Sequence, residues 1–165
     1  IHEDRFTALE ILVMQFEAGA PSARTAIYRF YLAHTAGINN WDLVDTSASY
    51  IVGAHLLERK RTPAYALVAS SSLWERRIGI VASHRWIAGG EVDDAYGLAA
   101  RLLEDPHDLT HKAVGWTLRL AGVRDRGRLV AFLREHYTRV PRTTLRYAIE
   151  HFMPAERARV LKGTF

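Results

Sequence analysis

Turn-forming residues interrupt this chain at short intervals, and this punctuation restricts the folds open to it more than any other feature. Between the interruptions, apolar residues such as Phe6, Leu9 and Val13 recur at spacings of three and four, which is the helical period. The interruptions are Gly, Pro, Asn and Asp clusters such as Gly89-Gly90. Alternating patterns typical of strands are nearly absent. The sequence therefore predicts an all-α protein of short helices joined by tight turns.

The same signals place about ten helices along the chain. Their expected ranges are 2–18, 22–36, 41–59, 63–70, 73–87, 92–104, 109–121, 126–138, 142–152 and 154–162. At three of the helix ends, the sequence has a residue that can cap or end the helix. Asn40 can cap the helix that follows it, and Ser71 or Ser72 can cap the helix that holds Trp74. Gly122 can end the helix that holds Trp116.

Taken in pairs, these helices form a repeat. The first helix of each pair begins near residue 41, 73, 109 or 142, which is a period of roughly 32 to 36 residues. That period is typical of an α-solenoid, in which each helix pair buries its apolar stripe against the next pair. We therefore expect residues 1–165 to form one repeat domain, a curved array whose leading helices line one concave side.

Composition narrows the classes of function. The net charge is +4, and 19 of the 22 basic side chains are arginine, whose planar fork binds phosphate at two points. A high-GC genome would produce the same bias. The absence of cysteine excludes disulfides, thiol nucleophiles and thiolate metal sites. No apolar stretch is long enough to cross a bilayer, and residues 1–12 are too charged for a signal peptide. We expect a soluble, cytoplasmic protein.

Trp41 and Asp45 are four residues apart, so on a helix they share one face. Leu43 and Val44 point elsewhere and can supply the core. The pair can therefore be exposed together, as an indole beside a carboxylate. In the alternative interpretation, Trp41 is a packed aromatic near a helix start and Asp45 only complements the helix dipole.

The repeat brings other residues beside this pair, because corresponding positions on successive leading helices lie about 8 to 10 Å apart. Arg77 and Arg146 occur at depths similar to that of Asp45, and Trp116 lies about one turn deeper in its own helix. One groove can thus present all four, and it would be basic and aromatic. Four further positions on these helices, together with Arg146, are candidates for phosphate contact, or else form a solvated surface: Arg76, Lys112, Arg119 and Arg142.

Other kinds of chemistry have little support. His107 and His111 have a spacing that could share a metal, but the residues between them do not form the HExxH pattern. No Gly-rich phosphate loop or GxSxG elbow occurs. We expect neither a metal nor a cofactor.

Several segments of the chain resemble the DNA alkylation repair enzymes of the AlkD type, which are built from HEAT-like helical repeats. The segments are Glu3-Asp4-Arg5-Phe6-Thr7-Ala8-Leu9, Asn40-Trp41-Asp42-Leu43-Val44-Asp45, Trp74-Glu75-Arg76-Arg77, Lys112-Ala113-Val114-Gly115-Trp116 with Leu118-Arg119, and Pro141-Arg142-Thr143-Thr144-Leu145-Arg146-Tyr147-Ala148. The resemblance implies an ARM/HEAT-like superhelix with a concave basic groove. It also implies a monofunctional DNA glycosylase that removes purines alkylated at N3 or N7, such as 3-methyladenine and 7-methylguanine, without flipping the base.

Carried over to this sequence, the resemblance implies that Asp45 is the catalytic carboxylate. Trp41 and Trp116 would pack on the deoxyribose and backbone of the lesion, and Arg77 would contact the DNA beside it. The partner would be double-stranded DNA containing alkylated bases, bound by a monomer. Family members carry further N-terminal helices, which we expect this chain to lack because it opens within a helix and without an initiator Met.

Two other functions remain open at this stage. One is a non-catalytic HEAT-repeat protein that binds bent or branched DNA through phosphate contacts and releases no base. The other is a scaffold that binds proteins, for which no salt-sensitive affinity for DNA is expected.

Overall fold

The computed structural model describes residues 1–165 and contains helices and no strands, which confirms the predicted all-α class. Its α-helices are α1 (His2–Ala18), α2 (Pro21–Ala33), α3 (Trp41–Asp45), α4 (Thr62–Val68), α5 (Leu73–Ala82), α6 (His84–Ala88), α7 (Asp93–Leu102), α8 (Asp108–Arg124), α9 (Arg126–Glu135), α10 (Arg142–Ala148) and α11 (Pro154–Val160). A 3-10 turn, η1 (Thr35–Gly37), follows α2, and a π-helical segment, η2 (Ser49–Gly53), follows α3.

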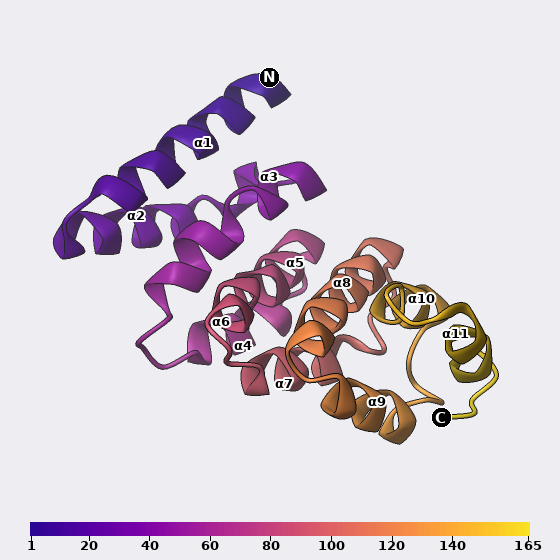
Figure 1. Ribbon diagram of the computed structural model, residues 1–165. Coiled ribbons are helices and arrows are strands. Elements are labelled where there is room, and N and C mark those ends of the chain that lie inside the picture. The colour runs from indigo at the N-terminus through magenta and orange to yellow at the C-terminus, as the bar shows by residue number, and fades with distance from the viewer.

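The helices follow one another in a curved array, from α1 and α2 at one end to α10 and α11 at the other (Figure 1). Four of them, α3, α5, α8 and α10, contact one another in that order. They lie along one side of the array, whereas α7 and α9 lie along the opposite side (Figure 1). Helices that are about 30 residues apart in sequence are therefore neighbours in space, and their side chains can meet in one site.

The buried apolar side chains form one continuous cluster, which runs from Leu9 in α1 to Val160 in α11. Its largest member is Trp86, whose indole N–H donates to the carbonyl of Gly53 at 2.8 Å and so has a partner although it is fully buried. None of the helices is both long enough and apolar enough to span a membrane.

The predicted helix over 41–59 is wrong in detail. The α-helix ends at Asp45, and the chain continues through a turn into η2. In the turn, the hydroxyl groups of Thr46 and Ser47 donate to carbonyls four residues earlier, at 2.9 and 2.6 Å. Such bonds compete with the backbone ladder and bend helices. The apolar spacing continues through the turn, so periodicity alone does not reveal the break.

The predicted helix over 73–87 is two helices, because Ser83 separates α5 from α6. Its hydroxyl donates to the carbonyl of Ile80 at 2.6 Å. Gly122 also differs from its predicted role, since α8 continues past it to Arg124. A Cβ at Gly122 would lie 2.3 Å from a methyl group of Leu129, so the glycine permits α9 to pack closely against α8.

Two of the predicted caps are confirmed. The side chain of Asn40 accepts the backbone N–H of Trp41 at 2.8 Å, and that of Ser72 accepts the N–H of Glu75 at 3.4 Å. These caps fix where α3 and α5 begin, and therefore which turn of each helix faces the neighbouring helix.

Candidate active site

Asp45 and Arg77 form a two-point ion pair between the end of α3 and the middle of α5. Nε of Arg77 donates to Oδ1 of Asp45 at 2.9 Å, and Nη2 donates to Oδ2 at 2.7 Å. A third donor, Nη1, reaches the carbonyl of Leu109 at 2.6 Å. The Arg77 side chain is 6% exposed and that of Asp45 is 17% exposed. The arginine thus fixes the carboxylate from behind and leaves its outer edge open.

Asp45 opens onto a cavity of about 310 Å³ between the leading helices. The residues that line it are Trp41, Asp45, Arg77, Leu109, Lys112, Trp116, Arg119 and Tyr147. The structure therefore brings together the indole and carboxylate pair, the second tryptophan, Arg77 and two of the basic candidates. Leu109 and Tyr147 were not predicted from the sequence.

Trp41 stands at the rim of this cavity, on the first residue of α3, with 53% of its surface exposed. The neighbouring Asp42 does not share the site. Its carboxylate bonds to Nε2 of His2 at 2.7 Å and so ties the start of α3 to α1. Trp41 is an exposed ring, whereas the alternative interpretation required a packed aromatic.

Trp116 is held in place by a histidine behind the cavity. The ring of His84 meets the indole edge to face, with centroids 4.4 Å apart. Nε2 of His84 lies 2.8 Å from the hydroxyl of Thr117, whose own hydrogen goes to the carbonyl of Ala113. The imidazole must therefore donate to that hydroxyl, which fixes its tautomer and the orientation of its ring.

Burial, with a smaller contribution from the charge of Arg77, lowers the pKa of His84 to about 3. In the unfolded chain this histidine takes up its proton near pH 6.5, well before the folded protein does. Protonation therefore favours unfolding as the pH falls. We expect this residue to make the protein less stable as the pH falls from 6.5 towards 3, by about 1 kcal/mol per pH unit at most.

Urea unfolding at pH 7, 6, 5 and 4 measures this dependence. The His84→Gln variant keeps a side-chain donor. Its free energy of unfolding should depend less steeply on pH than that of the natural protein, by the amount given above. His151→Gln is the control, because His151 is exposed, and that variant should keep the slope of the natural protein. Equal slopes in the natural protein and His84→Gln would contradict the prediction.

Tyr147 on α10 completes the wall that faces Trp116. Gly115 permits its approach, because a Cβ there would lie 2.4 Å from the Cβ of Tyr147 and 2.7 Å from the carbonyl oxygen of Thr144. Arg146, which the register placed in the groove, is exposed and does not line the cavity. Adjacent helical residues point about 100° apart, so the close packing of α10 on α8 turns Tyr147 inward and Arg146 outward.

The basic candidates differ in how firmly they are held. Lys112 pairs with Asp108 at 2.9 Å, and Arg119 pairs with Glu150, which is half exposed. Both lie on the cavity wall. These pairs are open to solvent, where ion pairs contribute little, so an incoming phosphate can compete for the cations.

The remaining two candidates are bound elsewhere. Arg76 points away from the cavity: its Nε donates to the buried carboxylate of Asp105 at 2.5 Å, and its Nη1 donates to the carbonyls of Ser70 and Ser71. Arg142 donates to the carbonyl of Leu161 at 2.5 Å while its side chain stays exposed.

The two histidines with metal-like spacing take part in local bonds. Nδ1 of His107 accepts the backbone N–H of Leu109, and Nε2 of His111 bonds to the carbonyl of Asp105. No group of three or more potential metal ligands is present.

Comparison with known proteins gives one match. A family model described as DNA alkylation repair enzyme matches residues 1–152, which is nearly the whole chain and includes every residue of the cavity. No curated protein and no solved structure matches the chain.

Proposed function

This chain belongs to the family of DNA alkylation repair enzymes, and we propose that it is a monofunctional glycosylase of the AlkD type. In this proposal, residues 1–165 form one HEAT-like repeat domain, which binds alkylated double-stranded DNA as a monomer. It hydrolyses the N-glycosidic bond of purines that carry a positive charge after alkylation at N3 or N7. 3-Methyladenine and 7-methylguanine are the expected products.

One observation carries the proposal. A fixed carboxylate, that of Asp45, opens onto a cavity between two tryptophans, and cationic side chains surround them. A negatively charged group with aromatic faces on either side suits a cationic sugar or base better than it suits an anionic or apolar ligand.

The proposed reaction depends mainly on the negative charge of Asp45, which stabilises a cationic sugar. Alkylation makes the base a good leaving group, so the bond breaks to give an oxocarbenium-like sugar. Asp45 stabilises that cation and orients the water that attacks C1′, as carboxylates do in glycoside hydrolysis. A carboxylate has about four lone-pair sites. Arg77 occupies two of those on Asp45, so the carboxylate can still accept from water.

We propose that the lesion is approached from its backbone side and is not flipped into a pocket. The exposure of Trp41 supports this, since an indole at the rim can pack on a deoxyribose that stays in the duplex. Each indole face can add about 0.5 to 2 kcal/mol of cation–π attraction. Lys112 and Arg119 would exchange their carboxylate partners for phosphates on either side of the lesion.

The proposal is tested by incubating the protein with methylated duplex DNA and measuring free bases in the supernatant by chromatography. Release of 7-methylguanine or 3-methyladenine supports it. Salt-sensitive duplex binding without base release would instead identify a DNA-binding protein that lacks the activity. If the protein neither releases bases nor binds the duplex in a salt-sensitive way, the remaining function is that of a protein-binding scaffold.

The exposed Arg146 provides a test of the DNA surface. Lacking any bond within the protein, it can be replaced by Gln at little cost in stability. We expect Arg146→Gln to weaken duplex binding for every sequence alike and to lower the slope of log K against log salt by about one. Arg101→Gln on α7 is the control and should leave the slope unchanged. A change of equal size in both variants would show that net charge alone is responsible.

A further inference from the structure

Trp116 is one of the two tryptophans proposed to pack on the lesion, and its indole forms part of the wall of the Asp45 cavity. The side chain is partly exposed. A ring with an open face has fewer contacts to fix its orientation than a ring that is enclosed in a close-packed core. The contacts on the other side of this indole therefore decide how precisely it can meet a substrate.

The ring that contacts this indole is that of His84, the first residue of α6. The two centroids are 4.4 Å apart and the ring planes are inclined at 66°, the edge-to-face arrangement that aromatic pairs favour. His84 does not itself line the cavity. It thus contacts the indole away from the place of the substrate.

A hydrogen bond holds His84 in turn. Its Nε2 lies 2.8 Å from the hydroxyl oxygen of Thr117, which follows Trp116 directly on α8. Thr117 is fully buried, and its own hydroxyl hydrogen goes to the carbonyl of Ala113 at 2.9 Å. The imidazole is therefore fixed at two points of α8, by a hydrogen bond to one residue and by ring contact with its neighbour.

The helices α5 and α6 hold α8 at two levels. Arg77 on α5 donates to the carbonyl of Leu109 at 2.6 Å, and His84 on α6 bonds to Thr117. The two levels are eight residues apart on α8, which corresponds to about 12 Å at the helical rise. Trp116 lies at the second level. Loss of the His84 contact can therefore loosen the indole while the Arg77 contact stays in place.

We propose that His84 is a positioning residue, which fixes the orientation of the Trp116 indole and thereby raises the rate of base release. This inference rests on the proposed glycosylase function. His84 touches no reacting atom in it, because it lies outside the lining of the cavity, and acts only through Trp116. Precise placement of groups around a reacting bond is a large part of catalysis.

Single-turnover release of 7-methylguanine tests the proposal in two variants. His84→Gln keeps a side-chain donor but removes the ring, and Thr117→Val keeps the ring but removes the acceptor of its N–H. Each should slow base release by about tenfold, near the upper end of what an aromatic contact contributes. The affinity for duplex DNA should not change, since the cations that bind phosphate stay in place.

The same change in a Trp116→Ala background shows whether His84 acts through the indole. Residues that act as a unit have effects that are not additive. His84→Gln should therefore slow release when the indole is present and have no further effect when it is absent, whereas its cost in stability should persist in both backgrounds. Equal slowing in both backgrounds overturns the proposal, because His84 would then act without Trp116.

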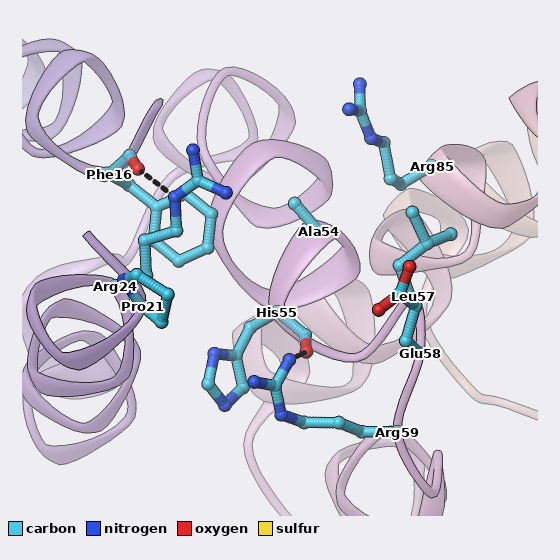
Figure 2. Close-up of a pocket in the computed structure, with 9 residues that line it drawn as sticks. All are labelled: Phe16, Pro21, Arg24, Ala54, His55, Leu57, Glu58, Arg59 and Arg85. Atoms are coloured by element: carbon cyan, nitrogen blue, oxygen red, sulfur yellow. Dashed lines mark hydrogen bonds between the residues drawn. The ribbon is translucent and has the colours of Figure 1, made fainter. Parts of the chain in front are cut away.

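His55→Gln and Thr110→Val are the matched controls. His55 is buried and its ring stacks on Tyr28 with centroids 4.0 Å apart, but it lines another cavity (Figure 2), which shares no residue with the candidate active site. Thr110 is buried on α8, as Thr117 is, and its hydroxyl has no partner. Neither variant should slow base release. Slowing in His55→Gln equal to that in His84→Gln would show that lost stability is responsible.

NMR relaxation of the indole N–H of Trp116 separates failure of this inference from failure of the proposed function. The Trp116→Phe variant assigns the signal. We expect an ordered indole in the natural protein and in His55→Gln, and a more mobile one in His84→Gln and Thr117→Val. Equal order in all four proteins overturns the inference, whether or not bases are released. Loosening of the indole, in a protein that releases no base, would contradict the glycosylase function and leave His84 as the residue that orients Trp116.

Discussion

The Asp45→Asn variant is expected to release 7-methylguanine from methylated duplex DNA about two to three orders of magnitude more slowly than the natural protein, the usual cost of removing one preorganised electrostatic group from a site. Asn has the shape of Asp and can still accept a bond from Arg77. It lacks the negative charge that would stabilise a cationic sugar. The loss should therefore appear in the rate of base release while duplex binding largely survives. Single-turnover release assays and a binding titration measure the two separately.

Loss of structure has to be distinguished from loss of chemistry, because Arg77 is 6% exposed and would lose its ionic partner. Breaking a buried ion pair is costly, so the variant should be less stable. Thermal unfolding followed by circular dichroism shows whether it is still folded at the assay temperature. Asp42→Asn is the matched control, since Asp42 neighbours the site on α3 but bonds to His2. Asp45 has no part in the mechanism if Asp45→Asn excises bases at the natural rate.

The residues that line the Asp45 cavity were predictable to the extent that the spacing of the helix starts determines which side chains meet. Trp41, Asp45, Arg77 and Trp116 lie on successive leading helices, and the spacing of helix starts was enough to place them in one groove. Helix boundaries need to be right only within about a turn for this, because each side chain spans several ångströms.

Details that depend on side-chain bonds were not predictable in the same way. The breaks after Asp45 and at Ser83 arise from hydroxyl groups that bond to backbone carbonyls, and the apolar pattern runs through both. On α10, the residue that faces the cavity is Tyr147 and not Arg146, which directly precedes it. The reason is that the rotation of α10 about its axis depends on its close contact with Gly115. A shift of one residue on a helix is a turn of about 100°, which periodicity cannot resolve for a helix as short as α10.

Asp45 and Arg77 come from similar depths of α3 and α5, which begin at Trp41 and Leu73, so the spacing of the helix starts was enough to predict that they meet. The same spacing did not predict which other charged residues line the cavity: Lys112 and Arg119 of α8 do, and Arg146 of α10 does not.

Gly115→Ala is expected to destabilise the protein by about 3 kcal/mol, the upper part of the range for overpacking a well-packed core. The added methyl group would lie 2.4 Å from the Cβ of Tyr147 and 2.7 Å from the carbonyl oxygen of Thr144, and both belong to the body of α10. Neither can be avoided by rotating a side chain, so α10 must move away from α8. Urea unfolding measures the loss.

Gly37→Ala provides the control, because Gly37 is exposed and a Cβ there meets nothing within 4 Å. That variant should unfold at the same urea concentration as the natural protein, and a midpoint shift like that of Gly115→Ala would refute the argument from contact. Displacement of α10 also moves Tyr147 away from the indole of Trp116 and opens the cavity. Base release by Gly115→Ala should therefore fall even at temperatures where the variant is fully folded, while Asp45 and Arg77 keep their ion pair. Gly115 thus links the packing of two helices to the shape of the site.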